Sequence, residues 1–256
     1  MAFSSVATIG TGNSTVNDTS LLLTTTAACE VGSLVALIIA LNNTQTTDGV
    51  TDEISSISDT NGNTWQRFTG AEYCNGQGGV DVGATVSVWY SIITTAMAVA
   101  AVITITLANS KARKCVSGWE FTLDAGSTVA IAGTLQTLAN DAVDPGAMAL
   151  SGLPSKEYLF FRGTASETGD NTAVTVTTNY TLITRAEADT GVGAANEQMS
   201  AFGEFRILTG TGSTSNPTYV SADHASVFFA LEEVFAAADI PKSHVFLQAV
   251  HRAASY

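Results

Sequence analysis

The hydrophobic and polar positions of this chain alternate in short segments that are typical of β-strands. Residues 32–41 form a continuous apolar run of strand length, which predicts a strand buried on both faces. Residues 85–93 are rich in β-branched and aromatic side chains, and residues 102–107 alternate with a period of two. Residues 115–123 read as a further strand. The pattern therefore predicts an all-β chain.

Residues 54–68 predict a β-hairpin, because two strand-like segments flank the dipeptide Asn61-Gly62. Asn and Gly tolerate the positive φ that both central residues of a type I′ turn require. Asp59, at the start of the turn, is expected to bind nearby backbone N–H groups through its carboxylate. Trp65 follows the turn and is expected to lie in the core, where the hairpin would fix the strand register.

The same turn resembles the start of a calcium-binding loop, because Asp59, Asn61 and Asn63 place oxygen ligands at alternating positions. The sixth position of such a loop is normally Gly and the twelfth Glu, but Thr64 and Gly70 stand there. The turn interpretation is therefore favoured, and no metal ion is predicted.

From residue 154 onward the order of elements recurs. Each half contains an apolar strand, a turn with an aromatic residue, an aromatic-rich strand and a closing strand that ends in glutamate. Two such halves predict an antiparallel, jelly-roll-like β-sandwich, built as one double sheet or as two closely packed ones. The matched segments are 34–39 with 157–161, 63–67 with 179–183, 86–92 with 199–205, and 115–121 with 227–233.

The pattern divides the chain into a sandwich and two flanking segments. The first segment is an extended lead-in with one or two edge strands, a Gly- and Ala-rich stretch connects the halves, and the last segment is an arm. The predicted boundaries are 1–31 for the lead-in, 32–235 for the sandwich, 32–123 and 154–234 for its half-repeats, 124–152 for the connection, and 236–256 for the arm.

The arm changes character after Pro241, which breaks the strand pattern. Ser243 is suited to cap a short helix with Phe246 and Val250 on its apolar face. Such a helix either docks on a neighbouring subunit or folds back on its own domain. The predicted core or interface residues of the whole chain are Trp65, Trp89, Trp119, Phe246 and Val250.

Composition excludes some partners. Charged residues are 13% of the chain and the net charge is −13, with only 10 Lys and Arg, so a nucleic-acid-binding surface is not expected. The one basic cluster, residues 111–114, is interpreted as the solvated start of a strand. Three widely spaced cysteines indicate reduced thiols in a protein assembled inside a cell. No secretory signal and no membrane insertion are predicted.

The sequence offers few candidates for a catalytic or ligand-binding site. No nucleophile elbow, zinc-binding helix motif or phosphate-binding loop occurs. His224 follows Asp223, but adjacent residues on a strand point to opposite faces. The repeat makes Glu120 and Glu232 equivalent, and two carboxylates can hydrolyse a glycosidic bond. Exposed carboxylates at strand ends are the favoured interpretation, so no catalytic residue and no cofactor is predicted.

Residues 32–40, 57–65, 88–90, 102–107 and 119–122 resemble, in this order, a β-sandwich family of tailed-phage virion proteins and related bacterial surface proteins. Its marks are a G-D-L-L-V-A strand, a V-S-D-S-x-G-N-T-W hairpin, and strands with V-W/F-Y, T-V-T-V and E-Y-S-G. Here Ser replaces the Asp of the first motif, and Leu-Asp stands where the last strand has Gly.

The resemblance implies a non-enzymatic virion component that is assembled in the host cytoplasm, binds copies of itself and other virion proteins, and coats a capsid or tail. A carbohydrate-binding receptor or adhesin module is the alternative, in which loop residues Tyr73, Tyr180 and Tyr219 would stack on host surface glycans. A glycoside hydrolase is the weaker alternative.

Overall fold

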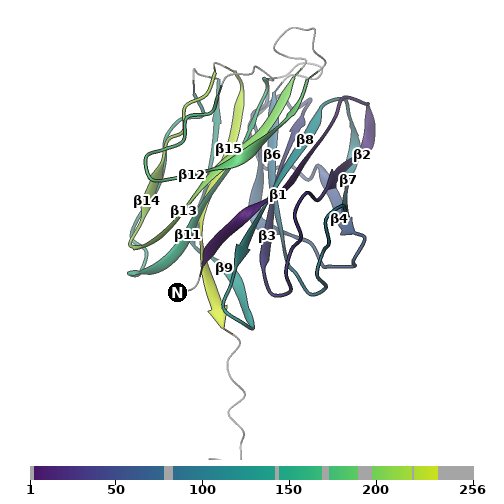
Figure 1. Ribbon diagram of the computed structural model, residues 1–256. Helices are drawn as coiled ribbons and strands as arrows, with labels where there is room; N and C mark the ends of the chain where they lie inside the picture. Colours follow the sequence, from purple (N-terminus) through teal and green to yellow (C-terminus); the bar gives the residue numbers. More distant parts are fainter. Residues whose placement is uncertain are drawn as a thin grey trace, which may run out of the picture.

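The computed structural model describes residues 3–77, 83–141, 144–168, 173–189, 198–220 and 222–235. All regular structure in these ranges is β-strand, arranged in two five-stranded and two smaller antiparallel sheets (Figure 1). The predicted all-β, sandwich-like fold is therefore confirmed.

The first half of the chain forms a five-stranded sheet in the order β1-β8-β3-β6-β5 and a three-stranded sheet in the order β2-β7-β4. All nine residues of the central strand β3 are buried, as the apolar run predicted. The strands are β1 (Ser4–Ser14), β2 (Asp18–Thr24), β3 (Leu34–Asn42), β4 (Ile54–Asp59), β5 (Gln66–Cys74), β6 (Ala84–Ile92), β7 (Val102–Lys111) and β8 (Lys114–Thr122).

The second half forms a five-stranded sheet in the order β12-β13-β11-β15-β9 and a two-stranded sheet of β10 and β14. Its strands are β9 (Ser127–Asn140), β10 (Met148–Leu150), β11 (Lys156–Ser166), β12 (Thr181–Ala188), β13 (Met199–Gly210), β14 (Ser213–Ser215) and β15 (His224–Phe235).

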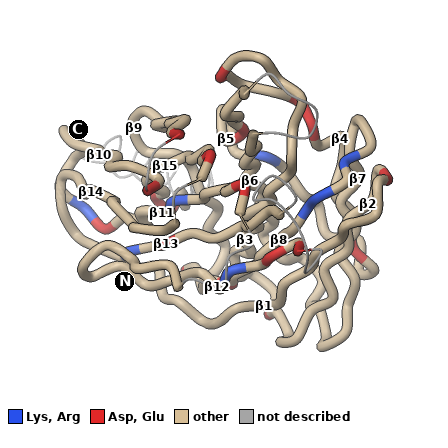
Figure 2. Tube along the Cα trace, turned by 90° about the horizontal axis from the view of Figure 1, so that it is seen from above, with Lys and Arg blue, Asp and Glu red and all other residues tan. Residues whose placement is uncertain are grey.

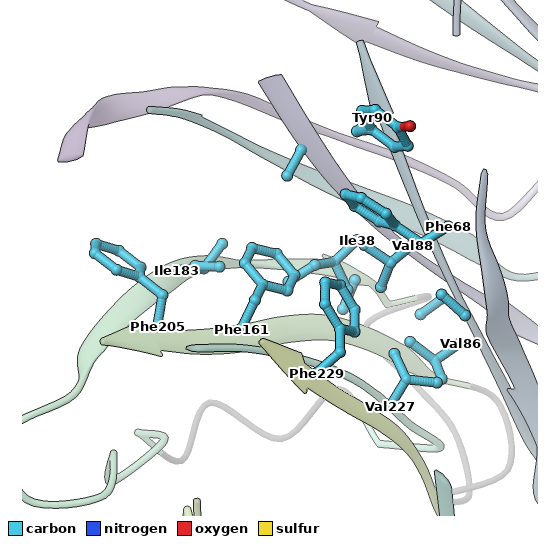
Figure 3. Close-up of a cluster of buried hydrophobic side chains, with 14 of the residues drawn as sticks. Ile38, Phe68, Val86, Val88, Tyr90, Phe161, Ile183, Phe205, Val227 and Phe229 are labelled. Atoms are coloured by element: carbon cyan, nitrogen blue, oxygen red, sulfur yellow. The ribbon is translucent and has the colours of Figure 1, made fainter. Parts of the chain in front are cut away.

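The four sheets stack as layers, with the two five-stranded sheets face to face in the middle. Between these two sheets lies the largest hydrophobic cluster, in which Phe161 and Phe229 of the second half meet Phe68 and Val88 of the first (Figure 3). Each large sheet also has one cluster on its outer side, between it and the small sheet of the same half. Alternate residues of β3 thus enter different clusters, which explains why its sequence is apolar throughout.

The two large sheets have the same strand order when β1 is matched with β9, β3 with β11, β5 with β12, β6 with β13 and β8 with β15. Three of these pairs, β3 with β11, β6 with β13 and β8 with β15, contain segments matched in the sequence, and the fourth matched pair overlaps the starts of β5 and β12. Across the central interface β1 packs against β12 and β5 against β9, so the lateral order is reversed between the sheets. The halves are therefore related by an approximate two-fold axis that runs parallel to the strands.

The predicted hairpin over residues 54–68 is wrong. Strand β4 pairs with β7 in the small sheet, whereas β5 pairs with β6 in the large sheet, so the turn carries the chain from one layer to the next. Gly62 has φ +77°, but Asn61 is not in the positive-φ region, which excludes a type I′ turn. An Asn-Gly turn fits either connection, and Trp65 at the end of this turn packs in the same cluster as Ile54 and Ile57 of β4.

The predicted connection over residues 124–152 is also wrong, because it contains β9, the 14-residue edge strand of the second large sheet. Small side chains suffice there, since an edge strand has a neighbour on one side only. The lead-in of residues 1–31 contains β1 and β2, which are both edge strands. The predicted arm, with Phe246 and Val250, lies outside the described residues.

Two facing glycines set the fit between the halves. Gly163 and Gly203 are cross-strand neighbours on β11 and β13. A Cβ on Gly203 would lie 2.4 Å from Cδ1 of Ile38, and a Cβ on Gly163 would lie 2.7 Å from Cγ2 of Val88. Side chains of β3 and β6 therefore fill the space that the two glycines leave open.

We expect Gly163→Ala to lower the free energy of unfolding by about 1–3 kcal/mol, because the added methyl group overlaps Val88. Adding Val88→Ala should recover part of this loss, which a double-mutant cycle in urea measures. Gly49→Ala is the control, because nothing lies within 4 Å of its added Cβ. Strictly additive effects of Gly163→Ala and Val88→Ala would contradict the packing described here.

Candidate functional site

The turn after β4 is organised by the carboxylate of Asp59. Its Oδ1 accepts a hydrogen bond from the backbone N–H of Asn61 at 2.7 Å and from Nδ2 of Asn63 at 3.3 Å. Its Oδ2 accepts one from Nε1 of Trp65 at 2.7 Å. The expected side-chain-to-backbone bond is therefore confirmed, and the same carboxylate also orients the tryptophan.

Asn63 connects this turn to the loop between β6 and β7. Its Oδ1 accepts from the backbone N–H groups of Thr94 and Thr95, both at 2.9 Å, and its Nδ2 donates to the carbonyl oxygen of Thr95 at 3.0 Å. The oxygens that a calcium ion would need are thus engaged within the protein. Among the described residues, no group of three or more His, Cys, Asp or Glu is placed to hold a metal ion.

The three tryptophans lie in two different environments. Trp65 and Trp89 are buried in the cluster between the first large sheet and its small sheet, with 7% and 9% of their surface exposed. Trp119 is half-buried and packs at the central interface, where its ring lies 5.4 Å from that of Phe205. Its Nε1 donates to Oγ of Ser5.

The predicted tyrosine platforms are wrong. Tyr180 and Tyr219 are buried, and Tyr73 is half-buried against the central cluster. Tyr180 precedes β12 much as Trp65 precedes β5, and it packs under the small sheet of its own half. Its hydroxyl bonds with Oγ of Ser213 at 2.7 Å. These rings belong to the core, and sequence alone did not distinguish buried from exposed loop aromatics.

Glu120 and Glu232 do not form a pair. Glu120 shares a strand face with Val116, toward the small sheet of the first half, whereas Glu232 shares one with Phe228, toward the small sheet of the second half. Both large sheets, about 10 Å apart, therefore lie between the two carboxylates, which prevents them from flanking one glycosidic bond.

The exposed interpretation of Glu120 is also wrong, because it is only 2% exposed and accepts a hydrogen bond from the backbone N–H of Glu30 at 3.0 Å. Glu232 is partly exposed and forms an ion pair with Lys156. Each carboxylate thus has a local partner within its own half.

The basic cluster is not solvated, in contrast to its prediction. Lys111 and Lys114 are both buried. Nζ of Lys111 lies 3.0 Å from Oε1 of Glu53, and Nζ of Lys114 lies 2.8 Å from Oδ1 of Asp18. Each ammonium group fastens the β7–β8 turn to a different neighbouring segment, which gives these lysines a structural role.

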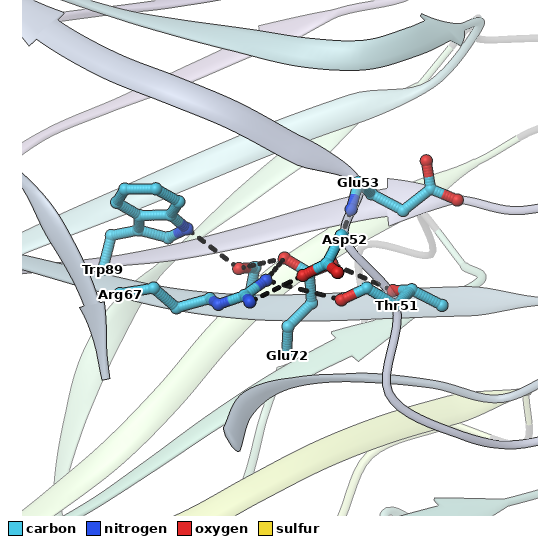
Figure 4. Close-up of polar contacts among 7 residues, drawn as sticks. Thr51, Asp52, Glu53, Arg67, Glu72 and Trp89 are labelled. Carbon is cyan, nitrogen blue, oxygen red and sulfur yellow. Dashed lines mark hydrogen bonds and ion pairs between the residues drawn. The ribbon is translucent and has the colours of Figure 1, made fainter. Parts of the chain in front are cut away.

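A buried carboxylate, that of Glu72 on β5, is the centre of a second polar network in the first half (Figure 4). Its Oε1 accepts from the backbone N–H of Glu53 at 2.7 Å and from Oγ1 of Thr51 at 3.0 Å. Its Oε2 accepts from Oγ of Ser87 at 2.8 Å and from Nη1 of Arg67 at 2.9 Å. All four partners surround one carboxylate that no solvent reaches.

The other end of Arg67 reaches the protein surface. Its Nη2 lies 2.7 Å from Oδ1 of Asp52, whose side chain is 85% exposed. The β5 ladder is irregular between Arg67 and Glu72, and Gly70 in this bulge has φ +80°. The network therefore holds the segment before β4 against the bulge of β5.

The second half has a buried cation in a comparable role. Arg162 on β11 is fully buried, and its guanidinium donates to the carbonyl oxygens of Gly146 and Pro145, both at 2.8 Å, and to Oγ of Ser226 at 2.9 Å. Burial lowers the pKa of Arg162 to about 10, against the opposing charge of its cross-strand neighbour Glu204. A single charge inside an apolar strand was the sequence signal for this site.

Polar contacts join the two halves at one end of the sheets. The backbone N–H of Gly83 donates to Oε2 of Glu167 at 2.8 Å, and Nδ2 of Asn75 donates to the carbonyl oxygen of His224 at 3.3 Å. Burial, together with the neighbouring Asp223, raises the pKa of Glu167 to about 7. Asp223 therefore has Glu167 as its partner and does not orient His224.

His224 is fully buried, and burial lowers its pKa to about 4. Its Nε2 contacts the carbonyl oxygen of Val220 at 3.2 Å. Two buried ionisable groups at this end thus shift in opposite directions, and both favour the neutral form.

The pKa of Glu167 predicts a pH-dependent stability. Because its folded-state pKa of about 7 is above the ordinary value of 4.5, its contribution is fully present below pH 4.5 and is lost as pH rises to about 7. Between pH 5 and pH 8 we expect wild type to lose about 1–3 kcal/mol relative to Glu167→Gln. Urea unfolding at several pH values measures this difference, and parallel stability curves would contradict it.

The three thiols are inert. Cys29, Cys74 and Cys115 are buried and form no disulfide, and burial raises the pKa of Cys29 to about 12.

Two pockets among the described residues have volumes of about 250 and 170 Å³. Typical small-molecule sites are larger, at about 300–1,000 Å³. In the part of the chain that the structure describes, no helix is long and apolar enough to cross a membrane.

Comparisons with protein families, with curated proteins and with solved structures found no match in any of the three.

Proposed function

We propose that this chain is a structural component of a tailed-phage virion, which associates with itself and with other virion proteins and coats the capsid or tail surface. The observation that carries the proposal is that the buried charged side chains bind other parts of the same chain. Glu72, Arg162, Lys111 and Lys114 each bind loop backbone or a neighbouring strand, and none faces a pocket described above. Charges placed in this way make a rigid building block.

The turn motif supports the same role. Its resemblance to the virion family rests on residues 57–65, and the structure uses Asp59, Asn63 and Trp65 of this motif to join two layers and a loop. Rigid layers suit a protein that must keep its shape in an assembly. The low charge content leaves a surface rich in hydroxyl and amide groups, which pack against copies without separating many ion pairs.

The glycan-binding alternative has less support, because two of its three proposed stacking residues, Tyr180 and Tyr219, are buried. A paired-carboxylate hydrolase also loses support, since Glu120 and Glu232 lie on opposite sides of the central layers.

The test is immunogold electron microscopy on phage particles produced from a genome that carries this gene. We expect labelling of the capsid or tail, and light scattering of the purified chain should show a homo-oligomer or binding to particles that lack it. Unlabelled particles, together with a monomer that binds glycans on an array, would overturn the proposal in favour of a receptor module. Capsid or tail genes on either side of this gene would support it independently.

A further inference from the structure

Strand β9 is an unusually open edge. It runs over 14 residues at the end of the second large sheet and contains no Asp, Glu, Lys, Arg or Pro. Within the described ranges, no strand pairs with its outer side. Edge strands of monomeric proteins are normally protected by charge, proline, shortness, a β-bulge or a covering segment. β9 has no charge and no proline and is not short; of these devices it has one bulge, at Gly133.

The other edges of the large sheets are protected. β5 carries Arg67 and Glu72, and β12 carries Arg185 and Glu187. β1, the counterpart of β9, is approached by the segment that follows β2, since the carbonyl oxygen of its Ile9 accepts from the backbone N–H of Thr26 at 2.7 Å. The counterpart of β2 in the second half is β10, which has only three residues and pairs with β14, not with β9.

A bulge at Gly133, with φ +74°, divides β9 into two parts. Beyond it, residues 136–140 pair regularly with β15. Thr134 and Thr137 are exposed, whereas Leu135 and Leu138 pack against clusters on either side of the sheet. Residues 136–140 are therefore uncharged and paired in a regular register, as a template for another strand must be.

We propose that two copies of the chain pair through residues 136–140, with the two β9 strands antiparallel. This inference rests on the self-association in the proposed function and names the surface that performs it. The contact is self-complementary, so it closes as a two-fold dimer and joins two five-stranded sheets into one of ten strands. The net charge of −13 repels copies elsewhere, whereas this edge adds no charge to the contact (Figure 2).

The test compares two doubly substituted proteins of equal charge by sedimentation equilibrium. Thr134→Lys with Thr137→Lys places like charges on the proposed contact, at residue 137, and directly beside it, at residue 134. Thr24→Lys with Thr181→Lys adds the same charge at exposed positions on the edge strands β2 and β12. We expect wild type and the control to dimerise, and the β9 variant to dissociate with a Kd at least about tenfold higher.

The outcomes separate this inference from the proposed function. A dimer that both lysine pairs leave unchanged would overturn the β9 contact but leave self-association intact. A wild-type monomer at all concentrations would also overturn the contact, while particle labelling would still decide the virion role. Circular dichroism checks folding, and if the β9 double variant fails to fold, Thr137→Lys alone is measured with the same expectation.

Discussion

Replacement of Trp65 by alanine is expected to lower the free energy of unfolding by about 4 kcal/mol, measured by urea denaturation. The indole is buried between two layers. Its removal therefore leaves a cavity, and the neighbouring apolar side chains lose their packing contacts with the ring. It also leaves Oδ2 of Asp59 without its 2.7 Å partner. The loss therefore combines a packing effect with a broken hydrogen bond.

Two variants separate these effects. Trp65→Phe keeps most of the ring but removes the N–H donor, and we expect it to cost about 1.5–3 kcal/mol, because the acceptor is a charged carboxylate. Trp119→Ala removes a half-buried indole and should cost less than Trp65→Ala. A nearly silent Trp65→Ala would mean that the ring contacts a partner rather than the core.

Replacement of Glu72 by alanine is expected to cost about 3–5 kcal/mol, again in urea. The substitution removes the acceptor of four hydrogen bonds, including one from the Arg67 guanidinium. The backbone N–H of Glu53 is then left without this carboxylate, and the segment before β4 loses its attachment to β5.

Asp52→Ala is the matched control, because Asp52 and Glu72 bind the same guanidinium. Its side chain is 85% exposed, so its loss should cost no more than about 1 kcal/mol. Equal losses in the two variants would show that the buried position of Glu72 contributes nothing beyond the ion pair itself.

The strands were predictable where burial shaped the sequence on both faces. β3 could be read from its apolar run because two layers cover it, and the order of apolar and aromatic segments gave the matched halves. The pairing partners of β4 and β5 were not predictable, because a turn motif does not state which layer receives the next strand. β9 was missed since half of this edge strand is Ala, Gly or Thr, which weakens the apolar signal relative to a central strand.

The polar networks were harder to predict than the core. Glu72 lies in a β5 segment with no distinctive motif, and its partners come from β4, β5 and β6 or the segments beside them. Glu167 depends on Gly83 from the other half, and their contact arises only when the two large sheets stack. Such sites need tertiary contacts between residues far apart in sequence, which local patterning does not encode.

The pairing of β1 with β8 also sets the order in which the chain folds during synthesis. Ser4 pairs with Thr122, so the first large sheet is complete only after residue 122 has been made. Its inner apolar face is covered only when β15 ends at residue 235, which is 113 residues later. At a synthesis rate of about 5–20 residues per second, this face stays uncovered for about 6–23 s. Chains interrupted in this interval would expose it permanently and aggregate.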